Sequence, residues 1–298
     1  MEQKGIMKHD LTRSRPALAA APPLAAVGLA GLRRQVALLE KLPQANAGET
    51  RGNLTWGLGS IDRHLPGGGL ALGALHEFVG HGPDLEEASL AAAAVTRLVS
   101  HRQQQGNGST LWIARQRDLY ARALPERGFD PDRLLHLRIN RNADALWAME
   151  EALRCTGLNA VVAEVSALDL TQSRRLQLAA EKSGVPAFII RRGGRADQLR
   201  QLSAQPIAAV TRWRIGPAPS LGIAALPHPT LPGAARWHIE LWRCRGGRPG
   251  TWLIEEHEDG WREATFPQPV AAALADRSLA PPAASVAASE PGIKRAAG

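Results

Sequence analysis

Residues 80–87 have the spacing of a phosphate-binding loop but carry the wrong side chains for phosphate. They follow an apolar run at 74–79 and precede a helical pattern at 85–104, which is the strand–loop–helix setting of the motif G-x-x-x-x-G-K-[ST]. In that motif the Lys pairs with phosphate oxygens and the hydroxyl group binds Mg²⁺. Gly80 stands at the first position of the motif, and its last three positions hold Leu85, Glu86 and Glu87.

The start of the following helix supplies negative charge of its own. Asp84 is placed to cap the first turn, and Glu87 follows three positions later, as in a capping box. Two unit charges about 4 Å apart interact by roughly 4 kcal/mol at an effective dielectric constant of about 20, so Glu86 in place of Lys turns an attraction into a repulsion of similar size. The loop therefore predicts no triphosphate binding, no catalytic residue and no cofactor, with an unusual nucleotide site as the alternative.

Short apolar runs alternate with helical patterns through the middle of the chain. This alternation is typical of an α/β fold with a mostly parallel central sheet flanked by helices. The expected strands cover residues 74–79, 110–114, 134–139, 160–165 and 186–191, and the expected helices cover 85–104, 117–127, 142–155 and 169–183. Strands without intervening helices then follow at 206–215, 236–244 and 251–256, and the turn at 246–250 predicts a C-terminal antiparallel hairpin.

The flanking segments differ from this core in composition. We expect a disordered N-terminus at 1–23, an N-terminal helix at 24–43, a core domain at 54–260 and a disordered tail rich in Ala and Pro at 261–298. Three consecutive glycines at 67–69 predict a tight connection or a close approach of two backbones.

The charge of the chain is concentrated in one segment. The net charge is +8, and residues 191–250 contain ten Arg against only Asp197 and Glu240. Such a segment favours an anionic partner, either nucleic acid or an acidic protein surface, and a solvated Arg-rich face is the alternative.

The two cysteines and the lengths of the apolar runs indicate where in the cell the protein is expected. Cys155 and Cys244 match no metal-binding spacing, so we expect no metal site and a reducing, cytoplasmic location. No apolar run reaches the roughly 20 residues that a membrane span requires, and no membrane association is expected.

Two groups of residues resemble known proteins. The glycine-rich stretch before the first strand is similar to the segment that leads into the phosphate-binding loop of RecA; it comprises 57–62, 67–70, Gly73, Glu77 and Gly80. More closely, residues 65–70 with 73–77, together with the distal stretch 236–250, resemble the ImuA family of RecA-related proteins from bacterial damage-induced mutagenesis operons. The resemblance covers about residues 54–256 and implies a RecA-like core with a degenerate nucleotide site.

The resemblance to RecA can be followed position by position. The catalytic glutamate of RecA should fall near Gln116, where the sequence has no carboxylate, and its metal-supporting acid falls at Glu164, for which a purely structural role at the strand end is the alternative. RecA has a DNA-binding loop after its next strand. This loop falls on Arg191, Arg192, Arg195 and Arg200, where a basic turn or a protein-binding loop is the alternative.

Arg and Trp also alternate along the later strands. Surfaces of this kind stack bases or engage proteins. The alternative is that the Trp side chains pack inward, which we favour for Trp237. The candidate contact residues are Arg212, Trp213, Arg214, Trp242, Arg243 and Arg245.

The resemblance to the ImuA family implies a non-enzymatic accessory protein of translesion DNA synthesis in the SOS response. Its partners would be an ImuB-like, inactive Y-family polymerase homologue and an error-prone polymerase III alpha-type subunit, with RecA and single-stranded DNA as further candidates. A cell-division inhibitor of the SulA type is the alternative, and a RecA-like ATPase or recombinase is a third.

Overall fold

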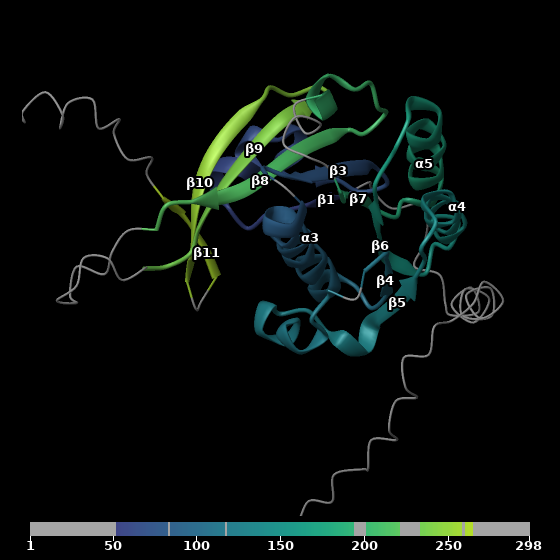
Figure 1. Ribbon diagram of the computed structural model, residues 1–298, viewed down its shortest axis with the longest axis horizontal. Helices are drawn as coiled ribbons and strands as arrows, with labels where there is room; N and C mark the ends of the chain where they lie inside the picture. Colours follow the sequence, from purple (N-terminus) through teal and green to yellow (C-terminus); the bar gives the residue numbers. More distant parts are fainter. Residues whose placement is uncertain are drawn as a thin grey trace, which may run out of the picture. The chain divides into compact units, whose positions relative to one another are not determined.

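The computed structural model describes residues 52–82, 84–116, 118–193, 201–220, 233–257 and 260–264, with only the backbone described at 84–88 and at Ala121. Nine strands form one mixed sheet in the order β11-β10-β9-β8-β3-β7-β6-β4-β5 (Figure 1). The strands from β5 through β8 in this order run parallel, and β9, β10 and β11 continue the sheet in antiparallel fashion. The predicted α/β architecture, with its C-terminal antiparallel hairpin, is confirmed.

The strands lie close to their predicted positions. The parallel strands are β3 (Leu75–Gly80), β4 (Ser109–Ala114), β5 (Leu134–Arg138), β6 (Leu158–Val165), β7 (Ala187–Arg191) and β8 (Thr211–Ala218). The antiparallel strands are β9 (Arg236–Cys244), β10 (Gly250–His257) and β11 (Gly260–Ala264). Strand β11 includes the first four residues that we assigned to the tail, and the predicted helix at 24–43 lies outside the described residues.

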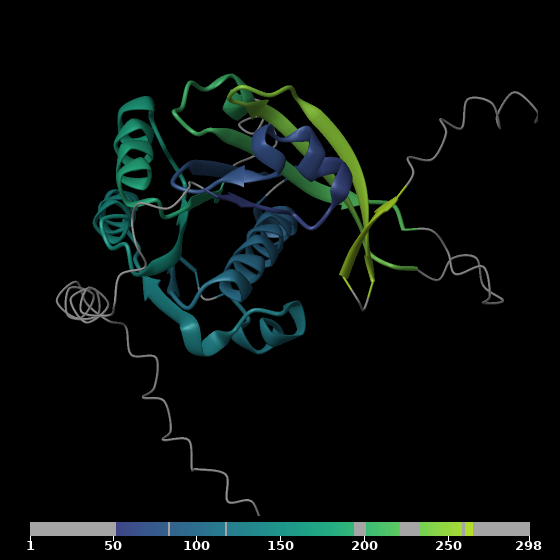
Figure 2. The ribbon, with the colours of Figure 1, turned by 180° about the vertical axis from the view of Figure 1, so that it is seen from behind.

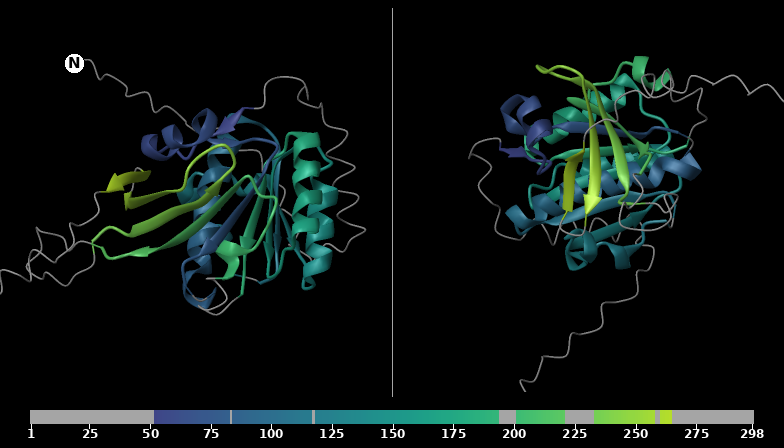
Figure 3. Two further views of the ribbon diagram at one scale, coloured as in Figure 1. Left: turned by 90° about the horizontal axis from the view of Figure 1, so that it is seen from above. Right: turned by 90° about the vertical axis from the view of Figure 1, so that its left-hand side faces the viewer.

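Helices cover both faces of the sheet. Helix α3 (Asp84–Gln105) packs on one face, and α4 (Asn142–Ala152) and α5 (Leu170–Ser183) pack on the other (Figure 3). Alternate residues of the central strands serve the two faces: in β7, Phe188 belongs to the core under α3 and Ile189 to the core under α4 and α5. Every residue of β6 is buried, as expected of a strand covered on both sides.

Local sequence signals account for the ends of α5. Asp169 accepts a hydrogen bond from the N–H of Gln172, and the Gln172 side chain accepts one from the N–H of Asp169, which completes a capping box. Gly184 ends the helix in the left-handed conformation, at φ 79°.

The predicted helix at 117–127 is wrong. Two short 3₁₀ turns occupy this region instead, at Ala121–Ala123 and Pro125–Arg127. Pro125 lacks the N–H that an α-helix needs in its interior, and Gly128 follows in the left-handed conformation. The prediction relied on the spacing of apolar residues, which does not show that Pro125 and Gly128 interrupt a helix.

The glycine-rich stretch before β3 packs against the C-terminal strands. It contains β1 (Asn53–Leu54), α2 (Gly59–His64) and β2 (Leu70–Ala71), drawn in purple and dark blue in Figure 2, and β1 and β2 pair as a small antiparallel sheet. A Cβ on Gly69 would lie 2.7 Å from the carbonyl oxygen of Leu54, which confirms the predicted close backbone approach. The backbone N–H of Ser60 donates to Glu263 at 2.7 Å, tying this stretch to β11.

Tryptophans fill the core between these elements. Trp56, Trp213 and Trp237 are at most 4% exposed. The Trp56 ring centroid lies 5.0 Å from that of Trp213 and 6.1 Å from that of Trp261. The inward packing predicted for Trp237 is therefore confirmed.

Among the described helices, none combines the length and the apolar character needed to pass through a lipid bilayer.

Candidate functional site

The loop after β3 has the backbone arrangement predicted from its sequence. Strand β3 ends at Gly80 and α3 begins at Asp84, so strand, loop and helix follow in order. Asp84 and Leu85 correspond to loop positions of the phosphate-binding motif but already lie in the helix, which leaves only residues 81–83 between the two elements. The N–H of His81 donates to the carbonyl oxygen of Ile215 at 2.8 Å and holds the loop against β8. The side chains of 84–88 lie outside the described residues, so the capping box stays a prediction.

An ion-pair network fills the corner where the parallel strands end. Arg192, directly after β7, donates from Nη1 to Glu164 Oε2 at 3.0 Å and from Nη2 to Asp118 Oδ2 at 2.7 Å. Its Nη2 also lies 3.4 Å from Gln116 Oε1, and the indole Nε1 of Trp112 donates to Glu164 Oε1 at 2.9 Å. We call Arg192, Glu164, Asp118 and Gln116 the corner network.

The corner network brings together Gln116 and Glu164, which the resemblance to RecA matches to its catalytic glutamate and its metal-supporting acid. Glu164 is 3% exposed and Arg192 is 7% exposed, so their charges interact away from bulk water. Ligands of open α/β sheets usually bind at the carboxyl ends of the strands. Here a guanidinium group of the protein itself neutralises the carboxylate at this position. A cleft of about 210 Å³ opens beside the network, between α3 and residues 118–127.

A second ion-pair network lies deeper in the sheet. Glu77 of β3 is fully buried, and its Oε2 accepts from Arg212 Nε of the neighbouring β8 at 2.6 Å. The remaining Arg212 nitrogens donate to backbone carbonyls of Leu202, Ser203 and Gln205. Arg191 of β7 approaches the other carboxylate oxygen to 3.8 Å. Burial lowers the pKa of Arg191, although Glu77 opposes that shift.

Sequence reasoning assigned none of these pairings, although the strands carried a signal for them. Glu77, Arg191 and Arg212 are charged residues in strands that are otherwise apolar. A buried charge almost always has a partner of opposite sign. The pairings join residues far apart in the sequence, so only the strand order shows which acid meets which base.

Some of the predicted contact residues are buried in the protein and others are exposed on its surface. Arg191, Arg192 and Arg212 are buried against acids, and Trp213 is fully buried. Arg214 bonds Glu240 and lies over the ring of Trp242, with 5.3 Å from its Cζ to the ring centroid. Arg243 and Arg245 are exposed at the end of β9, whereas Arg195 and Arg200 lie outside the described residues. Much of the positive charge counted in 191–250 is therefore compensated, partly by acids from other segments such as Glu77, Asp118 and Glu164.

The loop also contributes to a small cluster with β9. Ligand atoms of His81, His238 and Glu240 lie within 4.8 Å of one another and have the donor types that a divalent metal uses. Although burial raises the pKa of Glu240, hydrogen bonds from Arg214 and Trp242 bring it below its ordinary value. The Arg214 guanidinium on this carboxylate opposes a second cation there. Sequence reasoning missed the cluster because His81 and His238 lie far apart in the chain.

The strand order and the corner network define a class of protein. It is an α/β protein with a RecA-like core, in which side chains of the protein itself pair at the carboxyl ends of the central strands. No family model matches the chain. Proteins that do match include Protein ImuA of Caulobacter vibrioides strain NA1000 / CB15N and that of strain ATCC 19089 / CB 15; each is 41% identical over 230 residues, spanning 76% of this chain and 92% of the relative. The chain belongs to the ImuA family.

Proposed function

We propose that this protein is a non-catalytic accessory protein of damage-induced translesion DNA synthesis. It would act with an ImuB-like, inactive Y-family polymerase homologue and an error-prone polymerase III alpha-type subunit. Membership of the ImuA family supports the process. The corner network, in which Arg192 pairs with Glu164, is the observation that supports the non-catalytic role.

The chemistry of the corner disfavours nucleotide hydrolysis. A metal–nucleotide complex would need the Glu164 carboxylate, which already pairs with Arg192 and accepts from Trp112. By the resemblance to RecA, its catalytic base should fall near Gln116, and an amide cannot take up a proton at neutral pH. Glu86 at the Lys position adds repulsion for phosphate. A scaffold role needs none of these groups to react.

Nucleotide binding can be measured directly. Calorimetric titration of the full chain with Mg²⁺–ATP is expected to give no saturable heat up to millimolar nucleotide. The Arg192→Met variant is the matched control, because it removes the partner of Glu164 but leaves Glu86 and Gln116 in place. This variant should also fail to bind Mg²⁺–ATP. Micromolar binding by the unaltered chain would overturn the non-catalytic role.

The biological role needs a genetic measurement. Deletion of the gene is expected to lower damage-induced mutation frequency about tenfold or more, and the intact chain should restore it. Gln116→Ala should restore it equally well, because an exposed amide with one long bond to Arg192 contributes little to a scaffold. If Gln116→Ala fails to restore mutagenesis although it folds and accumulates normally, the non-catalytic role is wrong. Filamentation on overexpression, with normal mutagenesis after deletion, would instead favour the cell-division inhibitor.

A further inference from the structure

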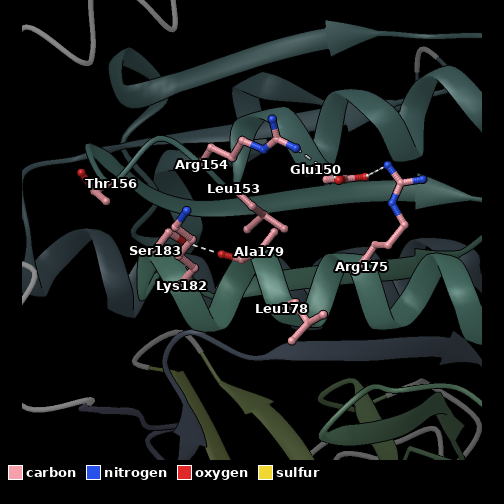
Figure 4. A pocket seen from close by; sticks show the side chains of 9 residues that line it. All are labelled: Glu150, Leu153, Arg154, Thr156, Arg175, Leu178, Ala179, Lys182 and Ser183. Atoms are coloured by element: carbon pink, nitrogen blue, oxygen red, sulfur yellow. Dashed lines mark hydrogen bonds and ion pairs between the residues drawn. The ribbon is translucent and has the colours of Figure 1, made fainter.

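The outer face of α5 carries an exposed apolar side chain between two hollows. Leu178 is 64% exposed and is lined up with Arg174 and Lys182 at helical spacing of four residues. A hollow of about 530 Å³ lies on one side, between α4 and α5 (Figure 4). A second hollow of about 380 Å³ lies on the other side, where Ile207 and Ala208 form its apolar wall. Leu178 lines both hollows.

Positive charge surrounds this leucine. Six exposed cations border the two hollows, and they come from the turn after α4, from α5 and from the end of β9: Arg154, Arg174, Arg175, Lys182, Arg243 and Arg245. The acids that line the same hollows are Glu150 and Glu181. We call these six cations with Leu178 the α5 surface.

The ion pairs on the α5 surface leave cations in excess. Arg154 and Arg175 both reach Glu150, at 3.4 and 2.7 Å, as Figure 4 shows. Arg245 lies 3.9 Å from Glu181, whose Oε1 also accepts from Gln177. Among the described residues, Arg174 and Lys182 form no ion pair within 4 Å. The surface is therefore complementary to a ligand that carries several negative charges.

We propose that the α5 surface docks an acidic segment of another protein, with an apolar side chain of that segment seated beside Leu178. This inference rests on the proposed function, in which docking is the activity, and it deepens that function by naming the chemistry of the partner segment. Charge complementarity gives specificity and speeds association, and an apolar contact at the centre supplies binding free energy.

The composition of the surface favours a protein segment over the other occupants. Single-stranded nucleic acid is usually held by stacking aromatics as well as cations, and no aromatic side chain is among the described residues that line the two hollows. The end segments of this chain, 1–51 and 265–298, each contain more Lys and Arg than Asp and Glu, so their charge does not complement the surface.

A binding measurement with a defined probe tests the surface. The probe is a fluorescent 20-residue peptide of Asp, Glu and Ser with one central Leu, followed by anisotropy with the full chain. Binding is expected to weaken about tenfold or more in Arg174→Glu/Lys182→Glu and in Leu178→Asp, and to weaken when the peptide's Leu is replaced by Ser. The matched control is Arg138→Glu/Arg141→Glu, which reverses two exposed charges outside the α5 surface and should bind as the unaltered chain does.

Further outcomes decide against the proposal. Equal binding by the unaltered chain and the α5 variants, or no binding of the peptide, would overturn it, as would tighter binding of a 20-nucleotide oligo(dT) that the α5 variants lose. Circular dichroism and melting must show that the variants fold.

Complementation separates the two proposals. If the intact chain restores damage-induced mutagenesis and Arg174→Glu/Lys182→Glu does not, both are supported. If that variant restores it fully, the α5 surface is wrong and the proposed function stands. If the intact chain does not restore it, the proposed function fails whatever the peptide does.

Discussion

Replacing Arg212 with Leu is expected to lower the free energy of unfolding by about 3–5 kcal/mol, since breaking a buried ion pair leaves an uncompensated charge. Glu77 is fully buried and Arg212 is 2% exposed, so no water replaces the lost partner. Arg191 remains 3.8 Å from the carboxylate and cannot supply the 2.6 Å bond from Arg212. The substitution also removes the donors that hold the backbone carbonyls of Leu202, Ser203 and Gln205. Urea unfolding followed by circular dichroism measures the change.

A double-mutant cycle separates the ion pair from the rest of the effect. Glu77→Gln combined with Arg212→Leu should be less destabilised than the sum of the single changes, by about 1–3 kcal/mol, because the neutral amide no longer requires a cation. The control is Arg141→Leu, which should cost less than about 0.5 kcal/mol, because the Arg141 side chain is 81% exposed and its Nε lies 3.8 Å from Asp144 Oδ2. A loss below about 1 kcal/mol for Arg212→Leu would show that the pair is not what stabilises this part of the sheet.

The second large effect is a dependence of stability on pH that comes from His76. Burial lowers the pKa of His76 to about 4, and its hydrogen bond to the Ala71 carbonyl opposes this shift. Nε2 lies 3.0 Å from that carbonyl, so it carries the proton and donates, whereas Nδ1 accepts from the hydroxyl of Thr211 at 2.8 Å. Thr211 in turn accepts from Trp213 Nε1 at 2.7 Å. A second proton, on Nδ1, would turn this acceptor into a donor, so the Thr211 hydroxyl could no longer donate to the imidazole.

The direction of the pH effect on stability follows from the number of protons that the folded and the unfolded chain bind. Between about pH 6.5 and pH 4 the unfolded chain protonates His76 and the folded chain does not, so acid favours the unfolded state in this window. The contribution of His76 to the free energy of unfolding should be fully present above pH 6.5. It should fall by about 3 kcal/mol as the pH drops to 4 and stay constant below that.

Matched histidine variants isolate this contribution. His76→Gln should lose the steeper part of the stability profile between pH 6.5 and pH 4, in urea unfolding at a series of pH values. His257→Gln, which changes a half-buried histidine beside Glu255 on β10, should keep it. If both variants and the unaltered chain give parallel profiles, His76 is not the group that titrates.

Arg212, His76 and the Arg192–Glu164 pair of the corner network are all charged or polar groups that are buried in an otherwise apolar sheet. Arg192 and Glu164 pair at the carboxyl ends of β6 and β7. Arg212 and Glu77 pair within the sheet, between β8 and β3. The His76 side chain of β3 is hydrogen-bonded to that of Thr211 on the adjacent β8. In each case the partners come from neighbouring strands that are distant in sequence. Much of the arginine charge that suggested a nucleic-acid surface therefore lies inside the protein, and the α5 surface is formed by a different set of cations.

The local signals in the sequence were sufficient to determine most of the elements. Apolar runs located β3, β6 and β7 to within one or two residues, because strands buried on both faces are apolar at most of their positions. The motif at 80–87 correctly predicted strand, loop and helix, because glycine spacing and helix periodicity are local properties. At 117–127 the apolar spacing predicted a helix that does not form, because Pro125 and Gly128 interrupt it.

Only the tertiary structure decided what the charged residues do. The sequence placed Arg191, Arg192 and Arg212 in a basic segment, and the apolar strands around Arg191 and Arg212 signal burial, but nothing local shows which acid each of them meets. The strand order brings Glu77 beside Arg212 and Glu164 beside Arg192, and the end of β9 brings Arg243 and Arg245 to α5. Burial and pairing depend on contacts between distant segments, and a charge counted along the chain carries no information about the acid that it meets in the fold.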